Sequence, residues 1–249
     1  MRVSLTSGRV STGAAWALLL LVMSLPTVAQ QLATVTGRIQ LVGSAKQHKS
    51  TASSTVVVWL TPLSPIPHEV SLKQPSEHPA LTQRNKSFHP HLLVIPVGST
   101  VEFPNDDPWF HNVFSLFDGK RFDLGLYETG TTRKVHFDRP GVSYIFCNIH
   151  PQMSAVVIVL DSPYYQISAK PGLVSIPNVP PGHYRLHVWN EAALPEMLSG
   201  LSREVTISEG RASIGDLRIE QTGDLLVNHK NKYGREYENP DPSSPIYTE

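Results

Sequence analysis

One short segment of the chain carries the residues whose side chains could do the most distinctive chemistry. Cys147, His150 and Met153 lie within seven residues of one another, in the sequence Tyr-Ile-Phe-Cys-Asn-Ile-His-Pro-Gln-Met. An apolar run precedes the cysteine, and a second, valine-rich run extends from Ala155 to Leu160. This pattern predicts two strands joined by a tight turn that holds a thiolate, an imidazole and a thioether. Soft sulfur ligands favour Cu(I) and imidazole suits Cu(II), whereas zinc has no use for the thioether, so the segment predicts a copper site.

Cys147 is the only cysteine in the chain, so it has no partner for an internal disulfide. A free thiol is a hazard in an exported protein, because the compartments outside the cytoplasm are oxidising. Two interpretations remain open from the residue alone. It is either a buried, inert core cysteine or a thiolate that a bound metal protects.

The second histidine of a copper site has to come from another segment, and the best candidate is His111. It lies in Phe-Pro-Asn-Asp-Asp-Pro-Trp-Phe-His-Asn-Val-Phe-Ser, which follows the strand pattern of residues 92–103. Together these segments resemble the cupredoxin family over the stretch from about Phe88 to Leu160. The Cys-x2-His-Pro-x-Met spacing is most similar to the amicyanin group of that family, whose ligand loop is short.

The resemblance implies one type 1 copper ion held by four ligands: His111, Cys147, His150 and Met153. It implies that Met153 is a weak ligand that tunes the metal. It also implies that Asn112 ties its loop to the cysteine loop, with Asn148 as its partner, and that His150 is the ligand nearest solvent, where electrons leave. The alternative is a related fold that has lost its metal or binds a different one.

The other histidines and the nearby acids are interpreted more plainly. The remaining histidines are expected to be surface residues, with His91 the one whose segment runs closest to the metal end. Four acids fall among turn residues and are expected to be solvated loop carboxylates: Asp106, Asp107, Asp123 and Glu128.

The flanking segments show a second pattern. Residues 33–63 and 163–220 contain strand-like alternation, and Asn-Val-Pro-Pro-Gly-His-Tyr-Arg-Leu begins at Asn178. This hairpin resembles the carboxypeptidase regulatory-like sandwich, in which strands like those of residues 33–63 come first. The resemblance implies that a cupredoxin unit is nested within that sandwich; the alternative is that residues 33–63 add strands to the cupredoxin and the second domain follows in tandem. Four aromatic residues are candidates for a carbohydrate-binding face, although core packing is the simpler interpretation: Tyr164, Tyr165, Tyr184 and Trp189.

The chain therefore divides into six segments. These are a signal peptide (1–29), N-terminal strands (33–63), a proline- and serine-rich linker (64–87), a cupredoxin domain (88–162), the second sandwich (163–220) and a polar tail expected to be disordered (221–249). The apolar run of the signal is shorter than the roughly 20 residues of a membrane-spanning helix. We therefore expect cleavage, no stable membrane span afterwards, and a periplasmic or extracellular location.

Composition narrows the classes of fold and function. The formal net charge is zero, which gives no reason to expect nucleic-acid binding, and 21 prolines punctuate short apolar runs. We expect an all-β protein, with a Greek-key cupredoxin sandwich and a small second β-sandwich built from the flanking segments. No phosphate-binding loop, zinc-protease helix or nucleophile motif occurs, so no enzyme is predicted.

One-electron transfer with an unidentified redox partner protein is the leading hypothesis. Copper delivery or storage is the second, and a cell-surface module that binds carbohydrate or protein is the third.

Overall fold

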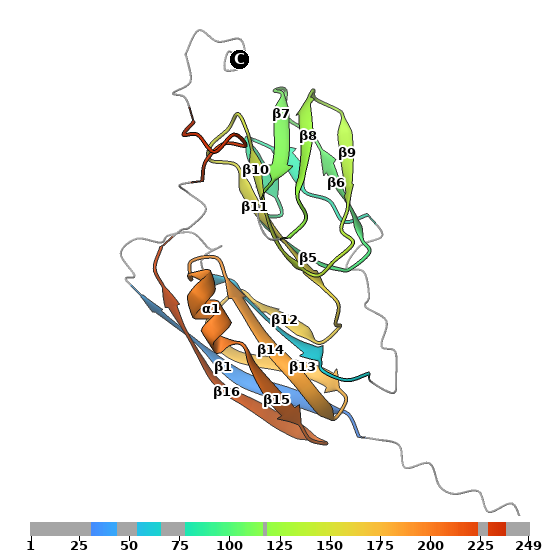
Figure 1. Cartoon of the computed structure of the whole chain (residues 1–249), viewed down its shortest axis with the longest axis vertical. Helices are drawn as coiled ribbons and strands as arrows, with labels where there is room; N and C mark the ends of the chain where they lie inside the picture. Colours follow the sequence, from blue (N-terminus) through green and yellow to red (C-terminus); the bar gives the residue numbers. More distant parts are fainter. Residues whose placement is uncertain (1–30, 44–53, 66–77, 117–118, 224–228, 238–249) are drawn as a thin grey trace, which may run out of the picture.

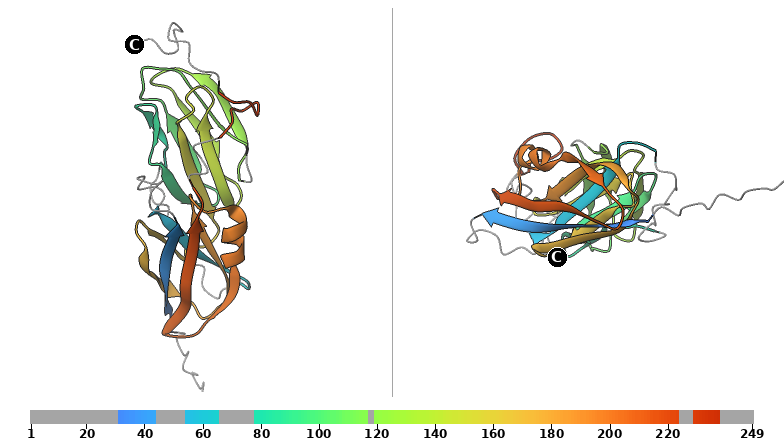
Figure 2. Two further views of the ribbon diagram at one scale, coloured as in Figure 1. Left: turned by 90° about the vertical axis from the view of Figure 1, so that its left-hand side faces the viewer. Right: turned by 90° about the horizontal axis from the view of Figure 1, so that it is seen from below.

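The computed structural model describes residues 31–43, 54–65, 78–116, 119–223 and 229–237. Within these ranges the chain forms sixteen strands and one short helix, α1 (Pro195–Leu201). The strands build two lobes that lie end to end (Figures 1 and 2). The prediction of an all-β protein is confirmed. No helix in the described ranges is long and apolar enough to cross a membrane.

One lobe, the flanking sandwich, is built from both ends of the chain. Its three-stranded sheet contains β13 (Gly172–Val179), β1 (Ala33–Gly43) and β16 (Arg211–Gln221), in that order. Its four-stranded sheet contains β12 (Tyr165–Ser168), β2 (Val56–Pro62), β14 (Gly182–Asn190) and β15 (Arg203–Ile207).

The two N-terminal strands occupy inner positions of these sheets. β1 pairs antiparallel with β13 and parallel with β16, and β2 pairs antiparallel with both β12 and β14. Neither sheet would be continuous without its N-terminal strand. The strands on either side of residues 78–161 thus pair with each other, which is the arrangement that the nested interpretation describes.

The other lobe, the central sandwich, is formed by the strands that lie between β2 and β12 in the chain. Its five-stranded sheet contains β5 (Leu92–Pro96), β11 (Ser154–Leu160), β10 (Gly141–Cys147), β7 (His111–Ser115) and β8 (Phe122–Tyr127). Two strand pairs complete it: β6 (Thr100–Pro104) with β9 (Thr132–His136), and β3 (Thr82–Arg84) with β4 (Ser87–His89).

Strand β11 is buried on both of its faces, and this explains the continuous apolar run in its sequence. Alternate residues, beginning at Ala155, pack in the core of the central sandwich with Cys147. The intervening residues, beginning at Val156, belong to a cluster that also contains Val56 and other buried residues of the flanking sandwich. A strand that is buried on both faces needs apolar side chains throughout, and the shared cluster joins the two lobes.

Several boundaries differ from those expected from the sequence. Strand β3 lies within the predicted linker (64–87), and β4 begins at its last residue. Both strands are mostly polar, so the sequence gives no strand pattern there. Residues 66–77 of that linker lie outside the described residues. Gln221 ends β16, and residues 229–237 of the predicted tail pack against the central sandwich. The predicted signal peptide (1–29) and residues 238–249 of the predicted tail also lie outside the described residues.

Three of the four aromatic residues considered for carbohydrate contact are core residues. Tyr164, Tyr184 and Trp189 are each exposed by 3% or less. The Tyr184 hydroxyl donates a hydrogen bond to the carbonyl of Pro180, so its polar end is satisfied inside the sandwich. These rings therefore stabilise the flanking sandwich and offer no face to a sugar.

Candidate metal centre

The ligand loop, residues 147–153, connects β10 to β11. Cys147 is the last residue of β10, and Met153 immediately precedes β11. The N–H of Cys147 donates to the carbonyl of Met153 (3.3 Å), and the N–H of Met153 donates to the carbonyl of His150 (3.0 Å). These bonds close a compact turn, which fixes where the three side chains begin.

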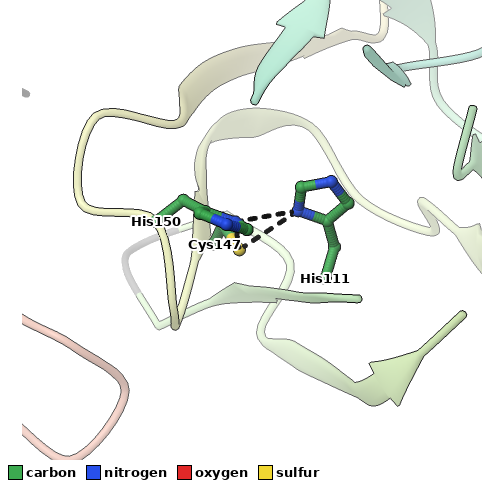
Figure 3. A group of neighbouring side chains, drawn as sticks. All are labelled: His111, Cys147 and His150. Carbon is green, nitrogen blue, oxygen red and sulfur yellow. Dashed lines mark hydrogen bonds between the residues drawn. The ribbon is translucent and has the colours of Figure 1, made fainter. Parts of the chain in front are cut away.

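His111 reaches the same place from the neighbouring strand. It is the first residue of β7, which pairs with β10 so that Val113 lies opposite Cys147. The His111 Nδ1 lies 3.7 Å from the Cys147 Sγ and 3.1 Å from the His150 Nδ1. The His150 Nδ1 lies 3.5 Å from the same sulfur. Figure 3 shows the two imidazoles converging on the sulfur.

These separations fit a shared metal ion. Metal–nitrogen and metal–sulfur bonds of roughly 2.0–2.3 Å, as measured for zinc, place neighbouring ligand atoms at such distances. His111, Cys147 and His150 are the one group of potential ligands of this kind in the described part of the chain, and all three are buried. Met153 is fully buried in the same core cluster as Cys147, and its role as a fourth ligand remains a prediction. Two imidazoles and a thiolate are donors that suit copper.

The buried carboxylate of Asp107 forms a hydrogen bond with the His111 ring on the side away from Cys147. The His111 Nε2 lies 2.9 Å from a carboxylate oxygen of Asp107, and the exposure of both side chains is 2% or less. The carboxylate can only accept, so the imidazole carries its proton on Nε2, and Nδ1 presents a lone pair toward the sulfur. Carboxylate–histidine pairs of this kind orient metal-binding imidazoles in many proteins.

Asp107 is itself fixed by the hairpin between β3 and β4. The N–H groups of Asn85 and Lys86 donate to the two carboxylate oxygens, at 2.5 and 2.9 Å. Both turn residues have positive φ, as a two-residue hairpin turn of type I′ requires. Asn105 accepts a hydrogen bond from the Asp107 N–H (3.0 Å), which completes the support. The interpretation of Asp107 as a solvated loop carboxylate is therefore wrong, because the hairpin supplies donors that replace water.

Burial sets the protonation of the metal-free centre. It lowers the pKa of His111, although the hydrogen bond with Asp107 acts in the opposite direction. Burial and the neighbouring His111 lower the pKa of His150 to about 4. Burial also raises the pKa of the Cys147 thiol, against the hydrogen bonds from nearby main-chain N–H groups. At neutral pH both imidazoles are therefore neutral, which is the form that binds a metal, and the thiol keeps its proton until a metal displaces it.

A main-chain hydrogen bond between Asn148 and Asn112 joins the two ligand-bearing segments. The N–H of Asn148 donates to the carbonyl of Asn112 (2.9 Å). The Asn112 side chain instead donates to Asp123 (2.7 Å), and the Asn148 side chain accepts a bond from the N–H of Lys232 (3.0 Å). The connection between loops is a main-chain bond, and both asparagine side chains reach outward to other segments.

His150 lies deeper than the resemblance implied, and His91, although it is no ligand, is partly buried where a surface residue was expected. His150 is only 2% exposed, so it is not a solvent-edge residue. His91 is not part of the metal-binding group. Its Nδ1 lies 3.1 Å from the carbonyl of Ser154 and its Nε2 lies 2.8 Å from the carboxylate of Glu191, so it links the central sandwich to the flanking sandwich.

Comparison with known proteins gives partial likenesses. Neither a family model nor a curated protein sequence matches this chain. Among solved structures, similar chains include a purple cupredoxin from Nitrosopumilus maritimus, with 29% identity over 33% of this chain and 99% of that chain, and a TM-score of 0.31. These structural neighbours are cupredoxins. Amicyanin from Paracoccus versutus is 23% identical over 34% of this chain and 84% of its own, with a TM-score of 0.31. The copper-containing nitrite reductase of Thermus scotoductus is 25% identical over 40% of this chain and 26% of its own, with a TM-score of 0.33. Most of the chain has no counterpart in these matches.

Proposed function

We propose that this protein is an exported one-electron carrier that holds a single type 1 copper ion with His111, Cys147, His150 and Met153. One observation carries the proposal: two imidazole nitrogens and a thiol sulfur, all buried, lie 3.1–3.7 Å from one another. A bound copper ion would supply one-electron chemistry by cycling between Cu(I) and Cu(II).

The surrounding residues suit that task because they limit rearrangement. Asp107 holds His111 at Nε2, and the paired strands β7 and β10 fix the distance between His111 and Cys147. Loss of the Cys147 proton on metal binding leaves a thiolate inside an apolar core, where water is excluded. A site whose ligands are already oriented costs little reorganisation when its charge changes.

Burial also separates electron transfer from copper delivery. A delivery site has to give up its metal to another protein, which requires ligands that the partner can reach. Here the exposure of the two histidines and the cysteine is 2% or less. Electron exchange is the function that such a closed site serves better, with an unidentified redox protein as partner.

Spectroscopy of the copper-loaded protein tests the proposal. We expect an intense thiolate-to-copper absorption band that Cys147→Ala abolishes, and reversible reduction by small redox reagents. Met153→Leu should retain copper and shift the reduction potential, because the thioether is a weak ligand. A protein that binds copper without the absorption band, or whose copper does not cycle reversibly, would contradict an electron carrier.

A further inference from the structure

The C-terminal strap, residues 229–237, lies against the metal centre although it follows β16 in the chain (Figure 1). It contacts three consecutive residues where β10 meets the ligand loop, Phe146, Cys147 and Asn148. The His229 ring stacks on Phe146, with ring centroids 4.0 Å apart. The Tyr237 hydroxyl donates to the carbonyl of Cys147 (2.8 Å), and the Lys232 N–H donates to the side chain of Asn148 (3.0 Å).

The strap also contacts β8, which pairs with the strand that carries His111. The Lys232 ammonium lies 2.8 Å from one carboxylate oxygen of Asp123, whose other oxygen accepts a hydrogen bond from Asn112. Hydrogen bonding between the pair raises the pKa of Lys232, and that bond helps to lower the pKa of Asp123. The strap therefore contacts Cys147 and its neighbours directly, and it is linked through Asp123 to Asn112, the neighbour of His111.

The strap has structure of its own. The Asn231 side-chain oxygen accepts hydrogen bonds from the N–H groups of Tyr233 and Arg235, at 3.0 and 3.1 Å. The Gly234 N–H donates to the carbonyl of Asn231 (2.9 Å), which closes a turn. A cavity of about 340 Å³ lies between this turn and the ligand-loop residues Asn148 and Ile149.

The Tyr237 bond matters because of which peptide group it grips. The carbonyl of Cys147 and the N–H of Asn148 belong to one planar peptide unit. Tyr237 holds the carbonyl from one side, and the carbonyl of Asn112 holds the N–H from the other. With both ends of the plane fixed, the backbone at Cys147 is fixed as well, and with it the direction of the Cα–Cβ bond that aims the sulfur.

We propose that the C-terminal strap is a positioning element of the metal centre, with Tyr237 as the residue that sets the orientation of Cys147. The proposal rests on the proposed function only for its effect on copper. Its structural part, restraint of the cysteine by the strap, applies equally to the metal-free protein.

The first test uses the metal-free, full-length protein. Tyr237→Phe removes the hydroxyl and keeps the ring, and the rate at which Cys147 reacts with a soluble thiol reagent reports how often the loop opens. Loss of one hydrogen bond predicts a roughly three- to tenfold faster reaction. The matched control is Glu236→Gln, which alters a side chain of the same strap that is 81% exposed, and it should react at the wild-type rate. Equal rates in all three proteins would overturn the proposal.

The second test uses the copper-loaded protein. Tyr237→Phe should shift the thiolate-to-copper band and the reduction potential, and Glu236→Gln should shift neither. If the strap only stabilised the fold, Tyr237→Phe would lower the unfolding temperature and leave the absorption band and the reduction potential unchanged. That result would also overturn the positioning role. If the wild-type protein shows no thiolate-to-copper band, the proposed function as an electron carrier is wrong. The thiol-reaction test still decides whether the strap restrains Cys147.

Discussion

Replacing Asp107 by asparagine is the most direct way to probe the support of His111. The substitution keeps the size of the side chain and removes its charge. One Asp107 oxygen accepts from the Asn85 N–H, and the other accepts from the Lys86 N–H and from His111. An asparagine has only one accepting oxygen, so its NH2 group must face at least one donor.

The magnitude follows from those bonds. A buried donor that loses its acceptor costs about 1–3 kcal/mol, so the metal-free Asp107→Asn protein should lose about that much free energy of unfolding. Loss of a residue that orients a metal-binding histidine typically costs roughly 10- to 100-fold in metal affinity. Without the carboxylate, the pKa of His111 should also fall further, because Asp107 opposes the effect of burial.

Two measurements check this prediction. Competition with a chromophoric Cu(I) chelator gives the copper affinity, and urea unfolding of the metal-free protein gives the stability. The control is Asp106→Asn, whose carboxylate is 42% exposed and pairs with Arg84 at the surface, so that it should cost at most about 1 kcal/mol. If Asp107→Asn binds copper as tightly as the wild-type protein, then the carboxylate does not orient His111 and the argument from geometry fails.

Three other predictions concern protons, domain structure and the contact between lobes. Copper binding at pH 7 should release about one proton, because burial raises the pKa of the Cys147 thiol. The copper affinity should therefore fall about tenfold for each unit by which the pH is lowered near neutrality. Calorimetry in buffers of different ionisation enthalpy counts the released protons, and a count near zero would contradict a protonated thiol. A fragment of residues 163–220 should give a poorly dispersed amide NMR spectrum, because both of its sheets lack their inner strands β1 and β2; a well-dispersed spectrum would show that those strands are dispensable. Glu191→Gln should lower the free energy of unfolding by about 1.5–3 kcal/mol, since Glu191 is 7% exposed and forms a hydrogen bond with His91. The control Glu204→Gln, in an exposed ion pair, should lower it by about 1 kcal/mol or less. Equal losses in urea unfolding would show that the buried link adds no stability.

The parts of the fold that the sequence predicts are those with local apolar patterns. Ala155–Leu160 is a continuous apolar run, and it forms all but the first residue of strand β11, which is buried on both faces. The hairpin of β3 and β4 escapes prediction because its strands are three residues each and mostly polar. The side-chain NH2 group of its buried polar residue, Gln83, donates hydrogen bonds to the hydroxyl of Tyr127 and to the carbonyl of Pro104, which only the folded chain brings near.

The same distinction applies to the metal centre. Cys147, His150 and Met153 share one turn, so their spacing alone indicates a ligand set. Asp107 precedes His111 by four residues, and that spacing is the one local signal that could have identified it. Nothing in the sequence around Tyr237 points to Cys147, which is ninety residues away. Supports made by polar side chains on distant segments leave no periodic pattern for sequence analysis to detect.

Asp107 and Tyr237 act on different ligands of the predicted metal centre. A double variant can therefore test whether their effects on copper affinity are independent. Asp107 restrains His111 through its ring, whereas Tyr237 restrains Cys147 through its peptide group. The two side chains share no hydrogen bond. The segments that they restrain are joined by the main-chain bond from Asn148 to Asn112 and by the pairing of β7 with β10. If these strands are rigid, each substitution should leave the other ligand undisturbed, and the losses of copper affinity in Asp107→Asn and Tyr237→Phe should add in the double variant to within about 0.5 kcal/mol. A larger coupling energy would mean that the ligand loop and the start of β7 move as one unit, so that either support orients both ligands.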